Sequence, residues 1–203
     1  MEYEELTVPH KFIDIGGFDN FSARDAREYF NWYIDCIPQR IDYLKNYVQR
    51  FQDNPMDYSL ESLYLLEDWF LTQIEYEYKT DEEIREYSIR NYFTESTDLL
   101  SLSEKTQWTD HTYALMYDIA RYYGEVMVRN INGMRWGVKT TSKNWVYRNK
   151  PVVFNDNSKY FAISPADTVE VRMCKYINKS RMPSSFRDIF SQYIEEFGVI
   201  KGF

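Results

Sequence analysis

The feature that most constrains the fold is a stripe of apolar side chains that runs from residue 26 to residue 51. The stripe consists of Ala26, Phe30, Tyr33, Ile37, Ile41, Leu44, Val48 and Phe51. Its successive members lie 4, 3, 4, 4, 3, 4 and 3 positions apart, which places them on one face of an α-helix. Ser22 precedes the stripe and Asp25 follows three positions later, a spacing typical of a capped helix start. Pro38 lies inside the stripe and cannot donate a backbone hydrogen bond, so we expect one long helix with a kink or a very tight break there.

Similar periodicity and capping signals predict further helices at about residues 59–76, 80–91, 110–130, 164–177 and 185–198. Residues 94–106 are expected to form a loop, with or without a short helical turn. Between residues 134 and 163 the period changes, and short β-prone runs at 135–139, 145–147, 152–154 and 160–163 alternate with polar turns. A sheet this small needs helices to pack on. The sequence therefore predicts a mostly helical α+β fold with five to six helices and one small antiparallel sheet at about residues 134–163.

Length and composition favour one domain over residues 1–203, with residues 1–21 as an irregular N-terminal segment. Cys36 and Cys174 are the two cysteines, which excludes a disulfide framework and a cysteine-rich zinc site. Both are interpreted as small packed hydrophobes. The N-terminus lacks a basic start followed by an apolar run, and no window approaches the ~18 apolar residues that cross a bilayer. We therefore expect a cytoplasmic protein that does not enter a membrane.

Charge is distributed unevenly along the chain, although the net charge is only −8. Residues 1–110 hold 24 acidic and 10 basic side chains, a net of −14, and residues 111–203 hold 8 and 14, a net of +6. Residues 53–110 alone hold 15 acidic and 4 basic side chains, a net of −11. This pattern predicts attraction to a basic protein partner and repulsion of nucleic acid and anionic membrane. The alternative is that the two halves attract each other on folding.

The candidate partner-binding residues are the acids Glu75, Glu77, Asp81, Glu82, Glu83 and Glu86. Paired carboxylates can also perform glycosidase chemistry or bind a divalent cation. However, acids in the first turns of a helix are favoured by the helix dipole, so a solvated acidic face is the main alternative to a catalytic pair. We interpret these residues as a patch for a basic protein, and we expect no metal site.

A second candidate site, for a small molecule, lies where the helix at 110–130 meets the sheet. Gly124 interrupts that helix at a cost of about 1 kcal/mol relative to alanine, which indicates close approach of another part of the chain. Around it, aromatic walls with one acid and one base can hold a polar ligand. The candidate ligand-binding residues are Tyr123, Glu125, Arg135 and Trp136. The alternative is a tight contact between helix and sheet, with Glu125 in a buried or half-buried ion pair.

The sequence contains no complete catalytic signature. His10 and His111 are the only histidines, and no His-x-x-x-His or Glu-x-x-His spacing occurs. No nucleophile elbow or glycine-rich phosphate loop is found, so no cofactor is expected and the balance is against an enzyme. Cations and aromatics interleave between residues 135 and 160, as in single-strand binders. The absence of a nucleic-acid motif and the negative overall charge argue against that role.

Several segments together resemble uncharacterised bacterial proteins of unknown function. The resemblance covers about residues 22–198 and rests on Tyr29-Phe30-Asn31-Trp32, Ile37-Pro38, Trp69-Phe70, Tyr122-Tyr123-Gly124-Glu125, Asn132-Gly133-x-x-Trp136, Pro151-Val152-Val153 and Ser164-Pro165. It implies no catalytic residues. By analogy of size and charge, some small acidic proteins are immunity proteins that neutralise a toxin. We therefore expect a non-catalytic interaction protein, immunity-like in character, that uses its acidic helical face. The alternative is a small-molecule-binding protein or enzyme with its site between the 110–130 helix and the sheet.

Overall fold

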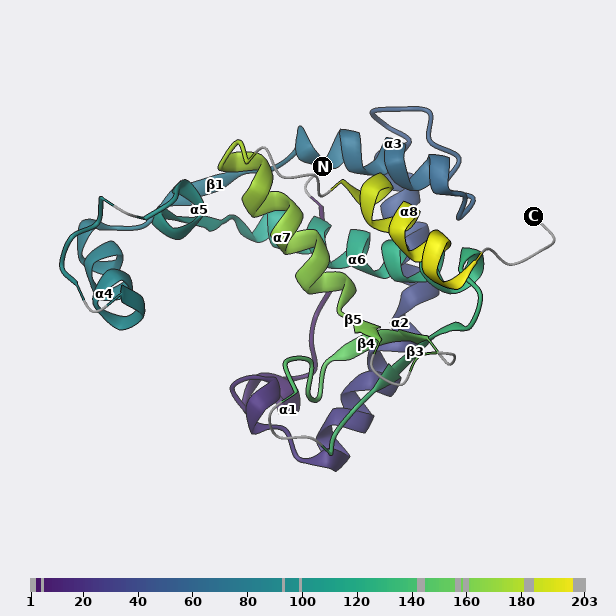
Figure 1. The fold of residues 1–203 in the computed structure, drawn as a ribbon, viewed down its shortest axis with the longest axis horizontal. Coiled ribbons are helices and arrows are strands. Elements are labelled where there is room, and N and C mark those ends of the chain that lie inside the picture. The colour runs from purple at the N-terminus through teal and green to yellow at the C-terminus, as the bar shows by residue number, and fades with distance from the viewer. Residues whose placement is uncertain are drawn as a thin grey trace.

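Helices dominate the fold, and two small sheets complete it (Figure 1). The computed structural model describes residues 3–4, 6–92, 94–98, 100–141, 145–155, 158, 161–180 and 185–198. Within these ranges it contains eight α-helices, one short 3-10 helix and two antiparallel sheets. The predicted fold class, a mostly helical α+β protein, is confirmed.

Six long helices coincide with the six predicted ones, and two single-turn helices add to them. In chain order they are α1 (His10–Ile13), α2 (Ala23–Val48), α3 (Leu60–Leu71), α4 (Asp81–Tyr92), α5 (Leu102–Lys105), α6 (Asp110–Asn130), α7 (Pro165–Ile177) and α8 (Phe186–Phe197). The short helices α1 and α5 have four residues each, and α1 lies in the segment predicted to be irregular. The described residues thus hold eight α-helices where five to six were predicted. Of the two additions, α5 is the short helical turn allowed for within residues 94–106, and a single turn such as α1 is too short to show a periodic apolar stripe.

The long helix α2 continues through Pro38, so one long helix is confirmed and the very tight break predicted as one alternative at Pro38 is wrong. At its start the Ser22 hydroxyl accepts a hydrogen bond from the backbone N–H of Asp25, and the Asp25 carboxylate accepts one from the backbone N–H of Ser22. The helix ends at Val48, so Phe51 lies beyond it and is 52% exposed. The last member of the predicted stripe is therefore outside the core.

The predicted meander is the three-stranded sheet β3 (Met134–Val138), β4 (Pro151–Asn155) and β5 (Ala162–Ile163). Residues 145–147, predicted as a strand, lead into a turn instead, and residue 160 lies outside the described residues. A second sheet, of β1 (Tyr76–Tyr78) and β2 (Thr106–Trp108), was not predicted. Its three-residue strands are too short to give an alternating pattern, and their pairing depends on contact between distant parts of the chain.

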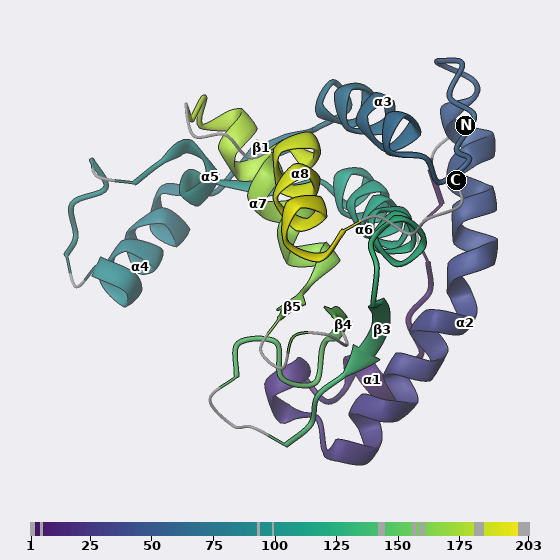
Figure 2. The ribbon, with the colours of Figure 1, turned by 45° about the vertical axis from the view of Figure 1, so that its right-hand side comes forward.

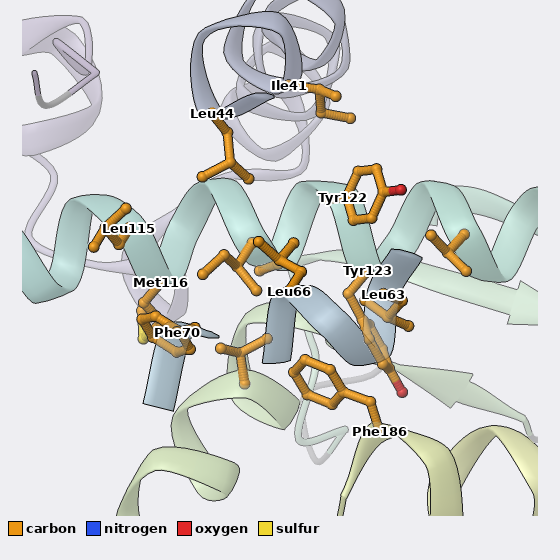
Figure 3. Close-up of a cluster of buried hydrophobic side chains, with 14 of the residues drawn as sticks. Ile41, Leu44, Leu63, Leu66, Phe70, Leu115, Met116, Tyr122, Tyr123 and Phe186 are labelled. Atoms are coloured by element: carbon orange, nitrogen blue, oxygen red, sulfur yellow. The ribbon is translucent and has the colours of Figure 1, made fainter. Parts of the chain in front are cut away.

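The core is organised around α6, which lies between α2 on one side and α3 and α8 on the other (Figure 3). Apolar side chains spaced three or four positions apart on each helix meet there. The fully buried members of this cluster include Ile41, Leu44, Leu63, Leu66, Phe70, Leu115, Met116, Tyr122, Tyr123 and Phe186. Tyr122 is also tied to α3, because its hydroxyl lies 2.5 Å from the Ser62 hydroxyl. Among the described residues, no helix has both the length and the apolar composition needed to cross a membrane.

Two parts of the molecule lie outside this core. Residues 75–108, which we call the acidic arm, extend away from the body, with α4 at the far end (Figures 1 and 2). The base of the arm is fixed to α6, because the Glu75 backbone N–H donates to the Thr112 hydroxyl, which donates in turn to the Glu75 carbonyl. Away from the arm, α1 lies beside the start of α2 (Figure 2). There Phe12, Phe21 and Ala26 form a separate small apolar cluster.

Candidate functional site

The contact between α6 and the three-stranded sheet brings together two of the four residues predicted to bind a ligand. The indole Nε1 of Trp136 donates to Glu125 Oε1 at 2.9 Å, and Arg129 Nε pairs with Glu125 Oε2 at 3.2 Å. The Trp136 ring lies directly over Gly124, where an added Cβ would be 2.1 Å from the ring atom Cζ2. The close approach inferred from Gly124 is therefore made by the Trp136 side chain, and Glu125 is engaged inside the fold.

The other two predicted ligand residues have different surroundings. Tyr123 is fully buried against Phe186 and Phe190, with ring centroids 4.8 Å and 5.3 Å away (Figure 3). Burial raises the pKa of its phenol well above the ordinary value. Arg135 is exposed, and its guanidinium lies 5.8 Å from the Phe154 ring centroid. A shared ligand role for these four residues stays a prediction.

All six predicted partner-binding acids are exposed on the acidic arm. Within the part of the chain that the structure describes, Glu82 alone among them has an ion pair, with Arg85 at 2.9 Å. Glu83 caps α4 by accepting from the backbone N–H of Thr80 at 2.8 Å and from the Thr80 hydroxyl at 2.7 Å. These two hydrogen bonds lower the pKa of Glu83 below its ordinary value. The six candidate carboxylates of the arm are therefore presented to solvent.

The arm also has apolar and concave features. Tyr78, Ile89 and Tyr92 are 68%, 43% and 48% exposed. A cavity of about 350 Å³ lies between α4 and the chain that follows it, and its charged lining residues are Asp81, Arg85, Glu95 and Lys105. Because two acids and two bases share this cavity, it has no preference for one sign of charge. The negative charge and the apolar area of the arm's surface therefore come from the exposed acids and aromatic side chains outside this cavity.

The sequence analysis missed a cluster of buried charges between α2 and α6. Asp118 of α6 accepts from Arg40 Nε and Nη2 at 2.9 Å and 2.5 Å, and from Arg121 Nη1 at 3.0 Å. The Tyr3 hydroxyl also donates to Asp118, at 2.6 Å. The side chains of Arg40, Asp118 and Arg121 are only 9%, 1% and 4% exposed. We call these three residues with Tyr3 the buried charge cluster.

A cavity of about 570 Å³ adjoins this cluster and is lined by the N-terminal segment, α2 and α6. Asp118 and Arg121 belong to its lining, as do the aromatic residues Phe12, Phe21 and Trp32. One signal in the sequence could have indicated the buried charge cluster: Arg40 lies between Ile37 and Ile41, next to the apolar stripe. A charge on the buried side of a helix needs a partner in the core. The partner itself, 78 residues away, could not be identified from local pattern.

In the described part of the chain, an acid of the acidic half meets a base of the basic half inside the fold at Glu67. Arg172 of α7 donates to Glu67 of α3, and the backbone N–H of Phe186 donates to the same carboxylate at 2.9 Å. Burial raises the pKa of Glu67 in spite of these two bonds. Intramolecular attraction therefore neutralises charge at Glu67, whereas the acids of the arm are left in solvent.

Comparison with families of known proteins, with curated proteins and with solved structures finds no match. The chain's own side chains are therefore the basis for a functional assignment. Among the described residues, no three His, Cys, Asp or Glu side chains are grouped so as to hold a metal ion. Cys36 and Cys174 are half-buried, and burial raises the pKa of each thiol, so neither resembles an activated nucleophile.

Proposed function

We propose that this chain is a non-catalytic interaction protein whose acidic arm binds a basic protein. One observation carries the proposal: the arm extends from the body and keeps Glu75, Glu77, Asp81, Glu82, Glu83 and Glu86 exposed (Figure 1). Residues 75–108 hold nine acidic and four basic side chains, a net of −5. Such a surface attracts cationic groups and repels anionic ones.

The distance of the arm from the body is what makes its charge available to a partner. Charges in water are screened over about 8 Å at physiological ionic strength, so basic residues elsewhere on the body have little effect on α4. Within the described chain, the ion pair that an arm acid makes, Glu82 with Arg85, is internal to the arm. A basic partner that touches the arm therefore meets carboxylates that are not already neutralised.

The exposed aromatic side chains give the arm a second source of affinity. Tyrosine is enriched among residues that contribute most to protein interfaces, because one side chain buries a large apolar surface and keeps a polar tip. Among the described aromatic residues of the arm, Tyr78 is the most exposed, and Tyr92 is about half exposed. Acids around a few aromatic anchors suit a partner with lysines or arginines around an apolar patch. An immunity protein that covers a basic toxin is one form of such a protein.

The test compares two variants that each lose three exposed negative charges. The arm variant carries Glu77→Gln, Glu82→Gln and Glu86→Gln, and leaves Glu83 unchanged because it caps α4. The body variant, which is the matched control, carries Asp42→Asn, Glu195→Gln and Glu196→Gln on α2 and α8. Each protein is used to capture partners from a cell extract, and the captured protein is then purified and titrated against all three by calorimetry.

We expect the captured partner to be basic and to bind the wild-type chain and the body variant alike. The arm variant should bind at least about tenfold more weakly, and the wild-type affinity should fall between about 50 mM and about 500 mM NaCl. Equal binding by the arm and body variants would contradict the proposal, as would an affinity that does not change with salt.

A further inference from the structure

We propose that the cavity beside the buried charge cluster, which we call the Arg121 pocket, binds a small organic monocarboxylate with an aromatic or aliphatic body. The pocket is lined by residues of the N-terminal segment, α2 and α6, and none of its lining residues belongs to the acidic arm. This inference does not depend on the proposed function of the arm, because the two sites share no residue.

The first argument is the charge of the cluster at the wall of the pocket. Arg40 and Arg121 are guanidinium groups that stay protonated in proteins, and Asp118 is the one carboxylate among the described residues that bonds to them. Tyr3 adds no negative charge, because burial, followed by the nearby Asp118, raises the pKa of its phenol far above the ordinary value. Two positive charges therefore face one negative charge in a buried place. A buried charge without a counter-charge is costly, so this site favours an anion.

The second argument is a hydrogen-bond donor that has no acceptor. Arg121 is 3% exposed and lines the pocket. Its Nη1 donates to Asp118, but its Nε–H is buried and has no hydrogen-bond partner within the described chain. Buried donors are almost always satisfied, and a guanidinium presents its N–H groups in a fork that matches a carboxylate. A ligand carboxylate in the pocket would supply the missing negative charge beside this guanidinium.

The guanidinium of Arg121 is held in place before any ligand arrives. Asp118 fixes one end of it by the Nη1 bond, and its Cζ atom lies 4.5 Å from the centroid of the Tyr33 ring. Stacking on an aromatic face restricts the guanidinium plane. A pre-organised donor loses little freedom on binding, which improves affinity for a small ligand.

The shape and lining of the pocket select the rest of the ligand. Its volume of about 570 Å³ lies in the range of small-molecule sites. Phe12, Phe21, Tyr29 and Trp32 form a connected group of aromatic contacts along one wall, with ring centroids 5.2–6.2 Å apart. Inorganic phosphate would leave this apolar wall without a partner. An acid with an aromatic or aliphatic body would cover the wall and place its single charge at Arg121.

The experiment titrates the full chain with three acids, phenylacetate, indole-3-acetate and hexanoate, and with the primary amide of each. An amide matches the shape of its acid but lacks the charge. We expect at least one acid to bind about tenfold or more tightly than its amide, because a hydrogen bond to a charged group is worth more than one tenfold step in affinity. Inorganic phosphate should not bind at the same concentrations.

Two variants separate the role of Arg121 from that of the fold. Arg121→Met removes the excess positive charge, so we expect the protein to remain folded and the preference for acid over amide to disappear. Ile13 lines the pocket and is 56% exposed, so its replacement does not threaten the core. Ile13→Glu should weaken binding of the acid about three- to tenfold relative to the matched control Ile13→Gln, because it places a like charge near the ligand.

The outcomes that overturn the inference are distinct. They are equal binding of every acid and its amide, no binding by any of the three acids, binding of phosphate as tight as that of the acids, and affinities that neither Arg121→Met nor Ile13→Glu changes. If the pocket binds none of these acids, the proposed function of the arm is still tested separately, because the arm variants are titrated against a protein partner.

Discussion

The acidic arm and the buried charge cluster use charged side chains in opposite ways. The arm exposes six candidate acids to water, and Glu82 is the one among them with an ion pair. The cluster has three charged side chains, all at most 9% exposed, joined by short hydrogen bonds. Two unit charges about 4 Å apart interact by about 1 kcal/mol in water and by about four times as much near a protein. The three charged side chains of the cluster should therefore affect stability more than the six acids of the arm. The acids of the arm should instead affect binding to other molecules.

The largest expected effect is that of Asp118→Asn. The substitution leaves Arg40 and Arg121 without a counter-charge in the core, so we expect a loss of about 3–5 kcal/mol in the free energy of unfolding. Urea denaturation followed by circular dichroism measures it. Asp42→Asn, at an exposed position of α2, is the control and should change stability by less than about 0.5 kcal/mol. A similar small effect for both substitutions would show that burial does not distinguish these carboxylates.

A smaller effect is expected for Tyr3→Phe. It removes the hydroxyl that donates to Asp118 at 2.6 Å and leaves the ring in place. A hydrogen bond to a charged group contributes about 1.5–3 kcal/mol, so stability should fall by that amount. Tyr78→Phe on the arm removes an equally polar hydroxyl from a ring that is 68% exposed, and it should have no measurable effect. Denaturation curves that coincide for these two variants would refute the prediction.

The pKa values of two glutamates are shifted in opposite directions from the ordinary value. Burial raises the pKa of Glu67, so its contribution to stability is present below the pKa of the unfolded chain and is lost as pH rises through the folded value. The hydrogen bonds from Thr80 lower the pKa of Glu83, so its contribution is present above the unfolded pKa and is lost as pH falls through the folded value. Carboxyl carbon shifts in NMR, recorded between about pH 2 and about pH 7, measure both midpoints around the usual glutamate value of about 4.3. A Glu67 midpoint below that of Glu83 would reverse the comparison.

The smallest effect on stability is expected for Glu86→Gln on the arm. Glu86 is exposed, and within the described chain it makes no ion pair, so stability should change by less than about 0.5 kcal/mol. The same change should be visible in partner binding at low salt, where each exposed charge contributes to association. A loss of stability above about 1 kcal/mol would mean that the arm's acids help to hold the fold together.

Local patterns predicted the long helices and the three-stranded sheet, because caps and apolar periodicity are properties of neighbouring residues. The Ser22 cap and the phase of the stripe across Pro38 are examples. The β1–β2 sheet and the buried charge cluster escaped prediction because each joins distant segments. Arg40 and Asp118 are 78 positions apart, and neither residue type at its position identifies the other. The acids of the arm were identified from charge alone, but their projection from the body depends on the pairing of β1 with β2.

The bond between Tyr3 and Asp118 has a consequence for the order in which the protein can fold during its synthesis. Tyr3 leaves the ribosome before its partner, which follows 115 residues later. At about 5–20 residues per second, the N-terminal segment waits between about 6 and about 23 seconds before the carboxylate that holds it exists. During that time α2 can form from local signals, while Tyr3 and the Glu4 carbonyl, which accepts from Arg40 Nη2 at 2.8 Å, cannot reach their final arrangement around Asp118. The N-terminal wall of the Arg121 pocket is thus synthesised well before α6, and the pocket can close only after Asp118 has been made.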